Sequence, residues 1–137
     1  MWWIYALLSA LFAALTAIFA KVGIKGVDTN LATAIRTLVI LILAWGIAFF
    51  NGSTSTINTL TKQNILFLFL SGIATGLSWI FYFKALQLGK VSQVAPVDKL
   101  SVAIAIILAV IFLKEPLTVK TAIGSLLIIG GTFVLIF

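Results

Sequence analysis

The sequence contains no cysteine and no histidine, and only three of its 137 residues are acidic. Without thiols or imidazoles, the chain has no disulfide framework, no thiol nucleophile and none of the usual ligands of zinc or haem. The three carboxylates, at Asp28, Asp98 and Glu115, stand far apart in the sequence and form no pair for acid–base catalysis. We therefore predict that the protein is not an enzyme, with no catalytic residue, cofactor or metal site.

Charge is scarce as well: 9% of the residues are charged, whereas 63% are hydrophobic. Soluble domains contain about 25% charged and about 45–50% apolar residues. The mean hydropathy of +1.28 leaves too little polar surface to cover a core in water, so most of the chain must face lipid. The nine basic residues are scattered between apolar runs instead of gathering on one face of a soluble fold. This pattern excludes nucleic acid as a partner and is typical of charges that flank membrane spans.

Long apolar runs predict the transmembrane helices. A helix needs about 20 mainly apolar residues to cross about 30 Å of hydrocarbon. Five segments meet this requirement, and the short linkers between them predict antiparallel neighbours in a single transmembrane domain over residues 1–137. The expected fold class is therefore all-α integral membrane, with spans at about 2–20, 29–50, 65–86, 91–113 and 118–137.

Loop lysines give almost no preference for one orientation in the membrane. Such residues normally set orientation by collecting on the cytoplasmic side. A five-span unit that inserts both ways would supply the two inverted halves of which many transporters consist. We therefore expect dual topology and an antiparallel homodimer, with a single, weakly signalled orientation as the alternative. The N-terminal side carries Lys62, Lys114 and Lys120, and the other side carries Lys21, Lys25, Lys84 and Lys90.

Arg36 and Asp98 are ionisable residues inside predicted spans. Each lies seven residues past the start of its span on the same side of the membrane, about 10 Å deep at 1.5 Å per residue. Ionisable groups at such depth are costly and usually face a partner or a wet cavity. We predict that Arg36, Asp98 and the adjacent Lys99 bind substrate. The alternative is an Arg36–Asp98 ion pair that only holds two helices together.

Pro96, Trp79 and Tyr82 extend this candidate site. Pro96 removes a helical hydrogen bond and frees the carbonyl of Ser92. We therefore predict a helix break beside Asp98. Irregular backbone at membrane depth is tolerated where it lines a cavity. Trp79 and Tyr82 combine an apolar ring with a polar group and suit the wall of a small-molecule pocket, although packing between helices explains each ring equally well.

Several short motifs follow one another in the second half of the chain: Val94-Ala95-Pro96-Val97, Leu113-Lys114-Glu115-Pro116-Leu117, and Gly124 with Gly130-Gly131. Together with Ala85-Leu86-Gln87-Leu88-Gly89 and Arg36, they resemble an EamA domain of the drug/metabolite transporter superfamily. The resemblance covers nearly the whole chain and implies export or exchange of metabolites. Usual members of that family carry two inverted EamA repeats, so one EamA-like repeat also favours dimerisation.

The predicted function is that of a secondary transporter in the cell (inner) membrane, an exporter or exchanger of small polar or zwitterionic metabolites that works by alternating access. Arg36 and Lys99 would attract a carboxylate or phosphate, and Asp98 an amine or a proton. Trp79 and Tyr82 would contact the body of the molecule. The alternative function is a non-transporting membrane subunit, or a component of a lipid-carrier flippase, that acts with a partner.

Overall fold

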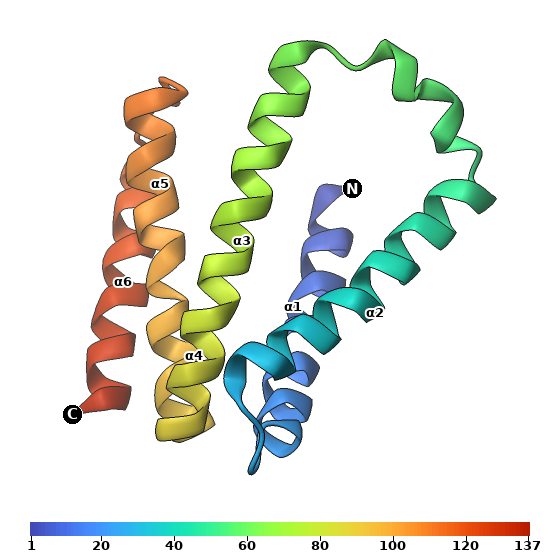
Figure 1. Cartoon of the computed structure of the whole chain (residues 1–137). Helices are drawn as coiled ribbons and strands as arrows, with labels where there is room; N and C mark the ends of the chain where they lie inside the picture. Colours follow the sequence, from blue (N-terminus) through green and yellow to red (C-terminus); the bar gives the residue numbers. More distant parts are fainter. The chain divides into compact units, whose positions relative to one another are not determined.

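Helices make up nearly all of the computed structural model, which describes residues 1–137 (Figure 1). Five helical segments are long and apolar enough to cross a membrane. This confirms the predicted all-α membrane fold class. The elements are α1 (Trp2–Gly23), α2 (Thr29–Phe50), the 3₁₀ helix η1 (Ser53–Thr59), α3 (Lys62–Leu88), α4 (Val91–Asp98), α5 (Leu100–Phe112) and α6 (Val119–Ile136).

The chain divides into two compact units, which we describe separately. Unit 1 comprises Met1–Phe19 and Leu88–Phe137 and thus holds most of α1 together with α4, α5 and α6. Unit 2 comprises Ala20–Gln87 and holds the last turn of α1 together with α2, η1 and nearly all of α3.

In unit 2, α2 and α3 converge at one end and diverge towards η1, which connects them at the other end (Figure 1). Two polar contacts tie the converging end together. The ammonium group of Lys21 donates to the carbonyl oxygen of Leu86, and the Gln87 side-chain amide donates to the carbonyl oxygen of Val27 at 3.1 Å. Both contacts involve the last turn of α3. The Leu86 carbonyl is one of the last carbonyls of the helix, which have no partner within it, whereas Val27 lies in the loop before α2.

The start of α2 follows from local sequence chemistry. The carboxylate of Asp28 accepts hydrogen bonds from the backbone N–H groups of Asn30 at 2.9 Å and Leu31 at 3.1 Å. These groups would otherwise be unpaired in the first turn, so Asp28 is the N-cap that makes α2 begin at Thr29. This is the residue at which the sequence predicted the span to begin.

The segment between α2 and α3 differs from the plain loop that the sequence predicted, because it contains η1. Hydroxyl groups support this 3₁₀ helix by donating to carbonyl oxygens three residues earlier: Ser55 to Gly52 at 2.8 Å and Thr59 to Thr56 at 2.7 Å. Such local bonds favour tight turns over a continued α-helix. Gly52, with a φ of 68°, adopts the left-handed conformation that separates α2 from η1.

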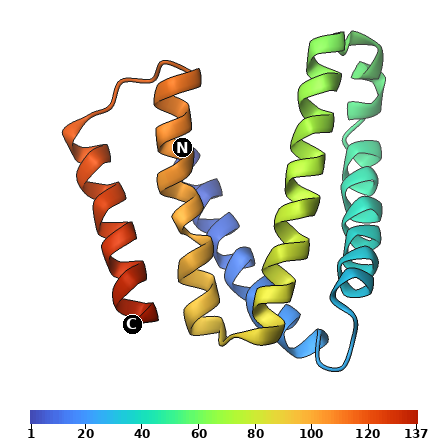
Figure 2. The same ribbon diagram turned by 60° about the vertical axis from the view of Figure 1, so that its left-hand side comes forward.

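In unit 1, α5 and α6 run antiparallel and pack against each other, and α4 packs against α6 (Figure 2). The fourth predicted span is not one continuous helix, because it breaks at Lys99 into α4 and α5. The sequence predicted a break near Pro96, and the structure places it three residues later. Pro96 itself lies inside α4.

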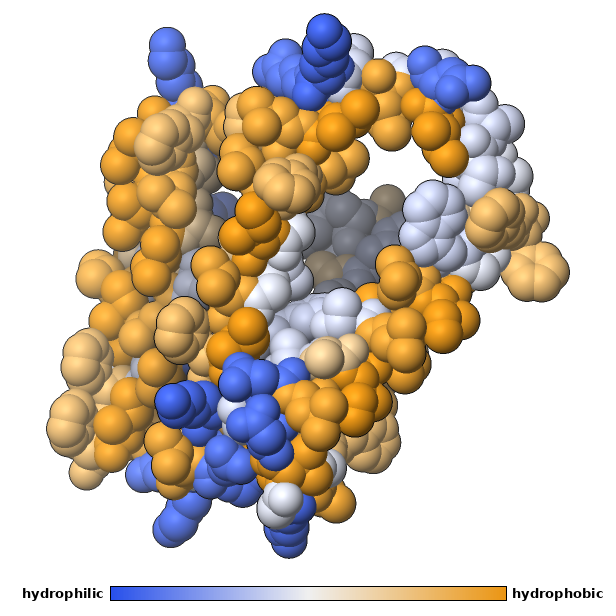
Figure 3. Space-filling model, viewed as in Figure 1, coloured by the Kyte–Doolittle hydropathy of each residue, from blue (hydrophilic) through white to orange (hydrophobic).

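Most side chains on the five spans are exposed, and they are apolar. At most 6% of the most hydropathic stretch of each span is buried. In Figure 3 the helices are coloured as largely hydrophobic, with hydrophilic groups gathered near helix ends. A helix that is apolar on nearly all sides belongs in lipid, because its backbone groups are already paired and its side chains need no water.

Candidate functional site

One face of α3 carries three aromatic residues and a leucine in the last part of the helix. Trp79, Tyr82, Phe83 and Leu86 follow the helical spacing i, i+3, i+4 and i+7, which places them on the same side of the helix. Phe83 and Leu86 are buried, whereas Trp79 and Tyr82 are half-buried. These residues lie in the C-terminal half of α3, the half that converges with α2 (Figure 1).

The guanidinium group of Arg36, on α2, lies against this aromatic face. Its central carbon is 4.3 Å from the centroid of the Trp79 ring and 4.9 Å from that of Phe83. Tyr82 lies one turn after Trp79 on the same face of α3. A cation over aromatic faces at these distances is attracted by the ring quadrupoles, with a strength of about 2 kcal/mol where the group is desolvated. The structure therefore brings together Arg36, Trp79 and Tyr82, three of the predicted site residues.

No carboxylate of unit 2 neutralises Arg36. Asp28 is the only acidic residue between Ala20 and Gln87, and it caps the start of α2. It lies eight residues before Arg36, about 12 Å away along the helix axis. Within its unit, the charge of Arg36 is therefore stabilised by rings, which cover the face of the guanidinium and leave the N–H groups at its edge able to bind an anion.

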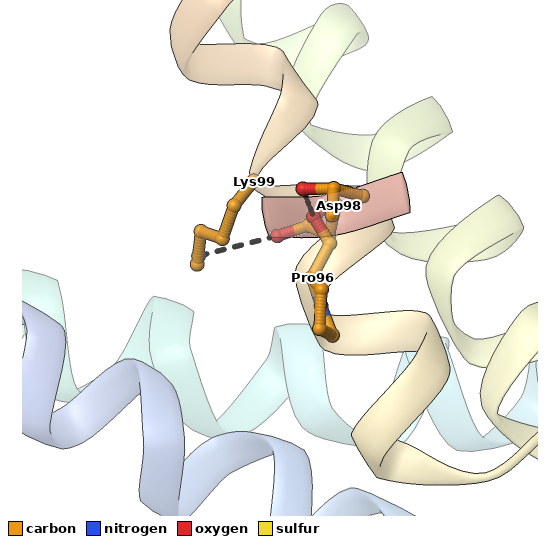
Figure 4. A network of polar contacts seen from close by, with 4 residues as sticks. Pro96, Asp98 and Lys99 are labelled. Carbon is orange, nitrogen blue, oxygen red and sulfur yellow. Dashed lines mark hydrogen bonds and ion pairs between the residues drawn. The ribbon is translucent and has the colours of Figure 1, made fainter. Parts of the chain in front are cut away.

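The helix break in unit 1 brings together the other predicted residues, Pro96, Asp98 and Lys99 (Figure 4). The backbone N–H of Lys99 donates to the carbonyl oxygen of Pro96 at 3.0 Å. The hydroxyl of Thr132, on α6, approaches the same oxygen at 3.2 Å and the carbonyl oxygen of Ile128 at 2.8 Å. Thr132 is only 4% exposed, so α6 supplies a buried donor at the point where the backbone of the fourth span is irregular.

Asp98 forms an ion pair with Lys99. The Nζ atom of Lys99 lies 3.3 Å from a carboxylate oxygen of Asp98, and the two side chains are 57% and 35% exposed respectively. Because Lys99 lies between α4 and α5, its side chain can turn back towards Asp98. Arg36 belongs to unit 2 and Asp98 to unit 1, so an Arg36–Asp98 pair stays a prediction.

Two residues of these sites were not predicted from the sequence. Phe83 shares a helix face with Trp79, but α3 is apolar on all sides and its pattern does not indicate which face meets a cation. Thr132 lies 36 residues after Pro96, and a threonine in an apolar helix usually bonds only to its own helix. Both roles depend on contacts between different helices. Neither site offers a group of histidine, cysteine or acidic side chains that suits a metal ion.

Comparison with known families identifies the family of the chain. Residues 1–137 match the EamA-like transporter family. The chain belongs to this family. It is therefore a multi-pass membrane protein of a transporter family, and the resemblance inferred from the sequence motifs is confirmed.

The chain aligns with nearly the whole length of two relatives and with less than half of a third. An uncharacterized transporter in the cobO 3' region of a Sinorhizobium species is 46% identical over 98% of this chain and 95% of the relative. An uncharacterized protein of Methanocaldococcus jannaschii is 30% identical over 96% of the chain and 93% of the relative. The uncharacterized transporter YvbV of Bacillus subtilis is 31% identical over 90% of the chain but 41% of its own length. No solved structure matches the chain.

The contact between Arg36 and Trp79 predicts a measurable coupling energy. Arg36→Met and Trp79→Leu each remove one partner and keep an apolar side chain in place. In a double-mutant cycle of the unfolding free energy in detergent, we expect a coupling of about 1 kcal/mol. Additive effects of the two substitutions would show that the rings do not stabilise the guanidinium.

The helix break predicts that the Thr132 hydroxyl contributes more to the free energy of unfolding than an exposed threonine hydroxyl does. Thr132→Val keeps the shape of the side chain but leaves the Pro96 carbonyl without its donor on α6, and should cost about 1 kcal/mol of unfolding free energy. Thr75→Val is the matched control, because the exposed Thr75 hydroxyl bonds only within its own helix, to Ser71 at 2.9 Å. Equal losses in the two variants, measured by thermal unfolding, would contradict the assigned role.

Proposed function

We propose that this protein is a secondary transporter, an exporter or exchanger of small polar or zwitterionic metabolites in the inner cell membrane, which works by alternating access as an antiparallel homodimer. Membership of a transporter family supports transport in general. The substrate class rests on the chemistry of the two candidate sites. A transporter needs no covalent step, so binding groups at membrane depth are sufficient.

The observation that carries the proposal is the position of Arg36 against the rings of Trp79 and Phe83. A cation at this depth is energetically costly, and such residues usually mark a functional site. The guanidinium fork matches a carboxylate or phosphate with two parallel hydrogen bonds. Arg36 is half-buried, so part of its side chain stays open to such a group. Trp79 and Tyr82 would then contact the body of the same molecule.

Unit 1 offers the complementary chemistry. Asp98 can bind an amine or a proton, and Lys99 can bind a second anionic group. Their ion pair is partly exposed, and exposed pairs of this kind contribute about 0–1 kcal/mol, so a substrate can replace it at low cost. The irregular backbone at Lys99 is of the kind that lines substrate sites in other transporters.

The antiparallel homodimer is supported by three observations of different kinds. The number of spans is odd, so a second copy inserted the other way would supply an inverted half. The loop lysines give little preference for orientation. Finally, the chain aligns with 95% and 93% of two relatives but with 41% of a third, which leaves room for a second unit in the longer protein.

Loss of ligand binding in Arg36→Ala tests the site. We would screen the purified protein by thermal shift against amino acids, amines, nucleotides and sugar phosphates. A ligand at 100 times its Kd stabilises the folded state by about 2.7 kcal/mol. We expect Arg36→Ala to remove this stabilisation and uptake of the same compound into liposomes. Lys25→Ala, which removes an exposed cation of the same unit, should leave both unchanged.

A double variant distinguishes a binding site from a structural ion pair. If Arg36→Ala misfolds but Arg36→Leu combined with Asp98→Leu restores both folding and transport, then Arg36 and Asp98 only hold helices together, and the site assignment is wrong. Protein that binds no screened compound and transports none in liposomes would favour a non-transporting subunit.

Dual insertion predicts partial labelling of cysteines placed beyond each of the two ends of α3. Ser53→Cys and Ser92→Cys are near-isosteric changes at exposed positions, separated by the whole of α3, and the chain has no native cysteine. An impermeant thiol reagent applied to intact cells should label a fraction of each variant. Complete labelling of one and none of the other would mean a single orientation and would exclude the antiparallel dimer.

A further inference from the structure

The buried residues of unit 2 all lie where α2 and α3 converge: Ile24, Thr29, Thr33, Phe83 and Leu86. We infer that Ile24, Phe83 and Leu86 make a gate which separates Arg36 from the water at that end, that Lys21 and Gln87 latch it, and that Phe83 couples its opening to Arg36. This inference rests on the proposed transport function, because a gate is useful only if Arg36 binds a substrate that must leave or enter there.

Several side chains between Arg36 and the loop that joins α1 and α2 are more buried than Arg36 itself. On α2, the residues Thr29, Thr33 and Arg36 share one helix face, and the first two are each 7% exposed whereas Arg36 is half-buried. On α3, Leu86 is 0% and Phe83 2% exposed, whereas Trp79 is half-buried. The site is therefore covered on one side along the helix axis and accessible on the other.

Ile24, Phe83 and Leu86 are the apolar layer of the gate. Ile24 follows α1 directly, in the connection to α2, and is 3% exposed. Phe83 and Leu86 lie about 8 Å and about 3 Å before the end of α3, at 1.5 Å per residue. Arg36 lies about 10 Å past the start of α2. Counted from these helix ends, Phe83 and Leu86 lie nearer to the ends than Arg36 does, and Ile24 lies in the loop itself.

Two polar contacts close over this layer, and both bridge distant parts of the sequence. The Lys21 ammonium donates to the Leu86 carbonyl, and the Gln87 amide donates to the Val27 carbonyl at 3.1 Å. Each is a side chain bound to a backbone oxygen, so either can be exchanged for a bond to water when the ends separate. Contacts of this strength suit a gate better than a permanent joint, because hydrogen bonds between membrane helices are individually weak.

Phe83 belongs to both the gate and the site. Its ring is buried in the apolar layer, and its centroid is 4.9 Å from the guanidinium carbon of Arg36. An anion that draws the guanidinium away from the ring removes an interaction that helps hold Phe83 in the closed position. Binding at Arg36 therefore favours opening, which is the link that alternating access requires between substrate and gate.

Thiol labelling of Thr33→Cys tests the gate without any substrate. In nanodiscs, a charged, water-soluble methanethiosulfonate reagent reacts only with a cysteine that water reaches. We expect slow labelling in the closed parent. Gln87→Ala should accelerate it about threefold to tenfold, the change in an opening equilibrium expected from one lost hydrogen bond. Gln63→Ala, at the opposite end of α3, is the matched control and should leave the rate unchanged.

Two further pairs of variants test the apolar layer and the coupling. Phe83→Ala should accelerate labelling more than Gln87→Ala does, and Phe81→Ala, which removes a ring that is 68% exposed, should not. Arg36→Met should also accelerate labelling, because the guanidinium no longer attracts the Phe83 ring. Its control is Leu38→Met on the exposed face of α2. If Phe83→Ala fails to fold, Phe83→Leu replaces it, with a smaller acceleration expected.

The outcomes separate the gate from the proposed function. Labelling that stays within twofold of the parent in Gln87→Ala and in the Phe83 variant overturns the gate. Equal acceleration by Gln63→Ala shows general loosening and overturns it as well. An unchanged rate in Arg36→Met refutes the coupling. If labelling behaves as expected but Arg36→Ala still binds its ligand, the gate stands and the proposed substrate site is wrong.

Discussion

A charged group inside a membrane span must be stabilised by other parts of the protein, because lipid offers it neither water nor counter-ions. Arg36 meets this constraint through aromatic rings on a neighbouring helix. The arrangement needs α2 and α3 to be close where Trp79 and Phe83 lie. The Asp28 cap begins α2 at this end, and the contacts of Lys21 with Leu86 and of Gln87 with Val27 join the loop and α1 to the end of α3. The loop between α1 and α2 therefore helps to keep the two helices close.

Unit 1 meets the same constraint for backbone groups. A helix that breaks at membrane depth exposes carbonyl oxygens, and each unpaired group in lipid costs several kcal/mol. The break at Lys99 is accompanied by the buried hydroxyl of Thr132 beside the Pro96 carbonyl. Small and hydroxyl-bearing residues let helices approach closely enough for such bonds. In both units, a costly polar feature is held by a residue from another helix.

The aromatic partner of Arg36 has consequences for binding. A carboxylate partner would neutralise the charge and occupy the donors of the guanidinium, whereas rings cover its face and leave its edge for a ligand. Asp98 and Lys99 form a partly exposed ion pair, which under the proposed function a zwitterion would replace with its own charges. The two sites thus offer both signs of charge, which is the property on which the proposed substrate class depends.

The sequence by itself determined the solvent of the chain, the five spans and the family, because hydropathy and motif order are properties of consecutive residues. It also singled out Arg36, Trp79, Asp98 and Lys99 as candidate site residues, since polar groups are conspicuous in apolar segments. Only the tertiary structure decided which ring meets the guanidinium, where the fourth span breaks and how Gln87 reaches Val27. Those outcomes depend on how separate helices pack, and helices that are apolar on all sides do not reveal in their sequence which face meets which neighbour.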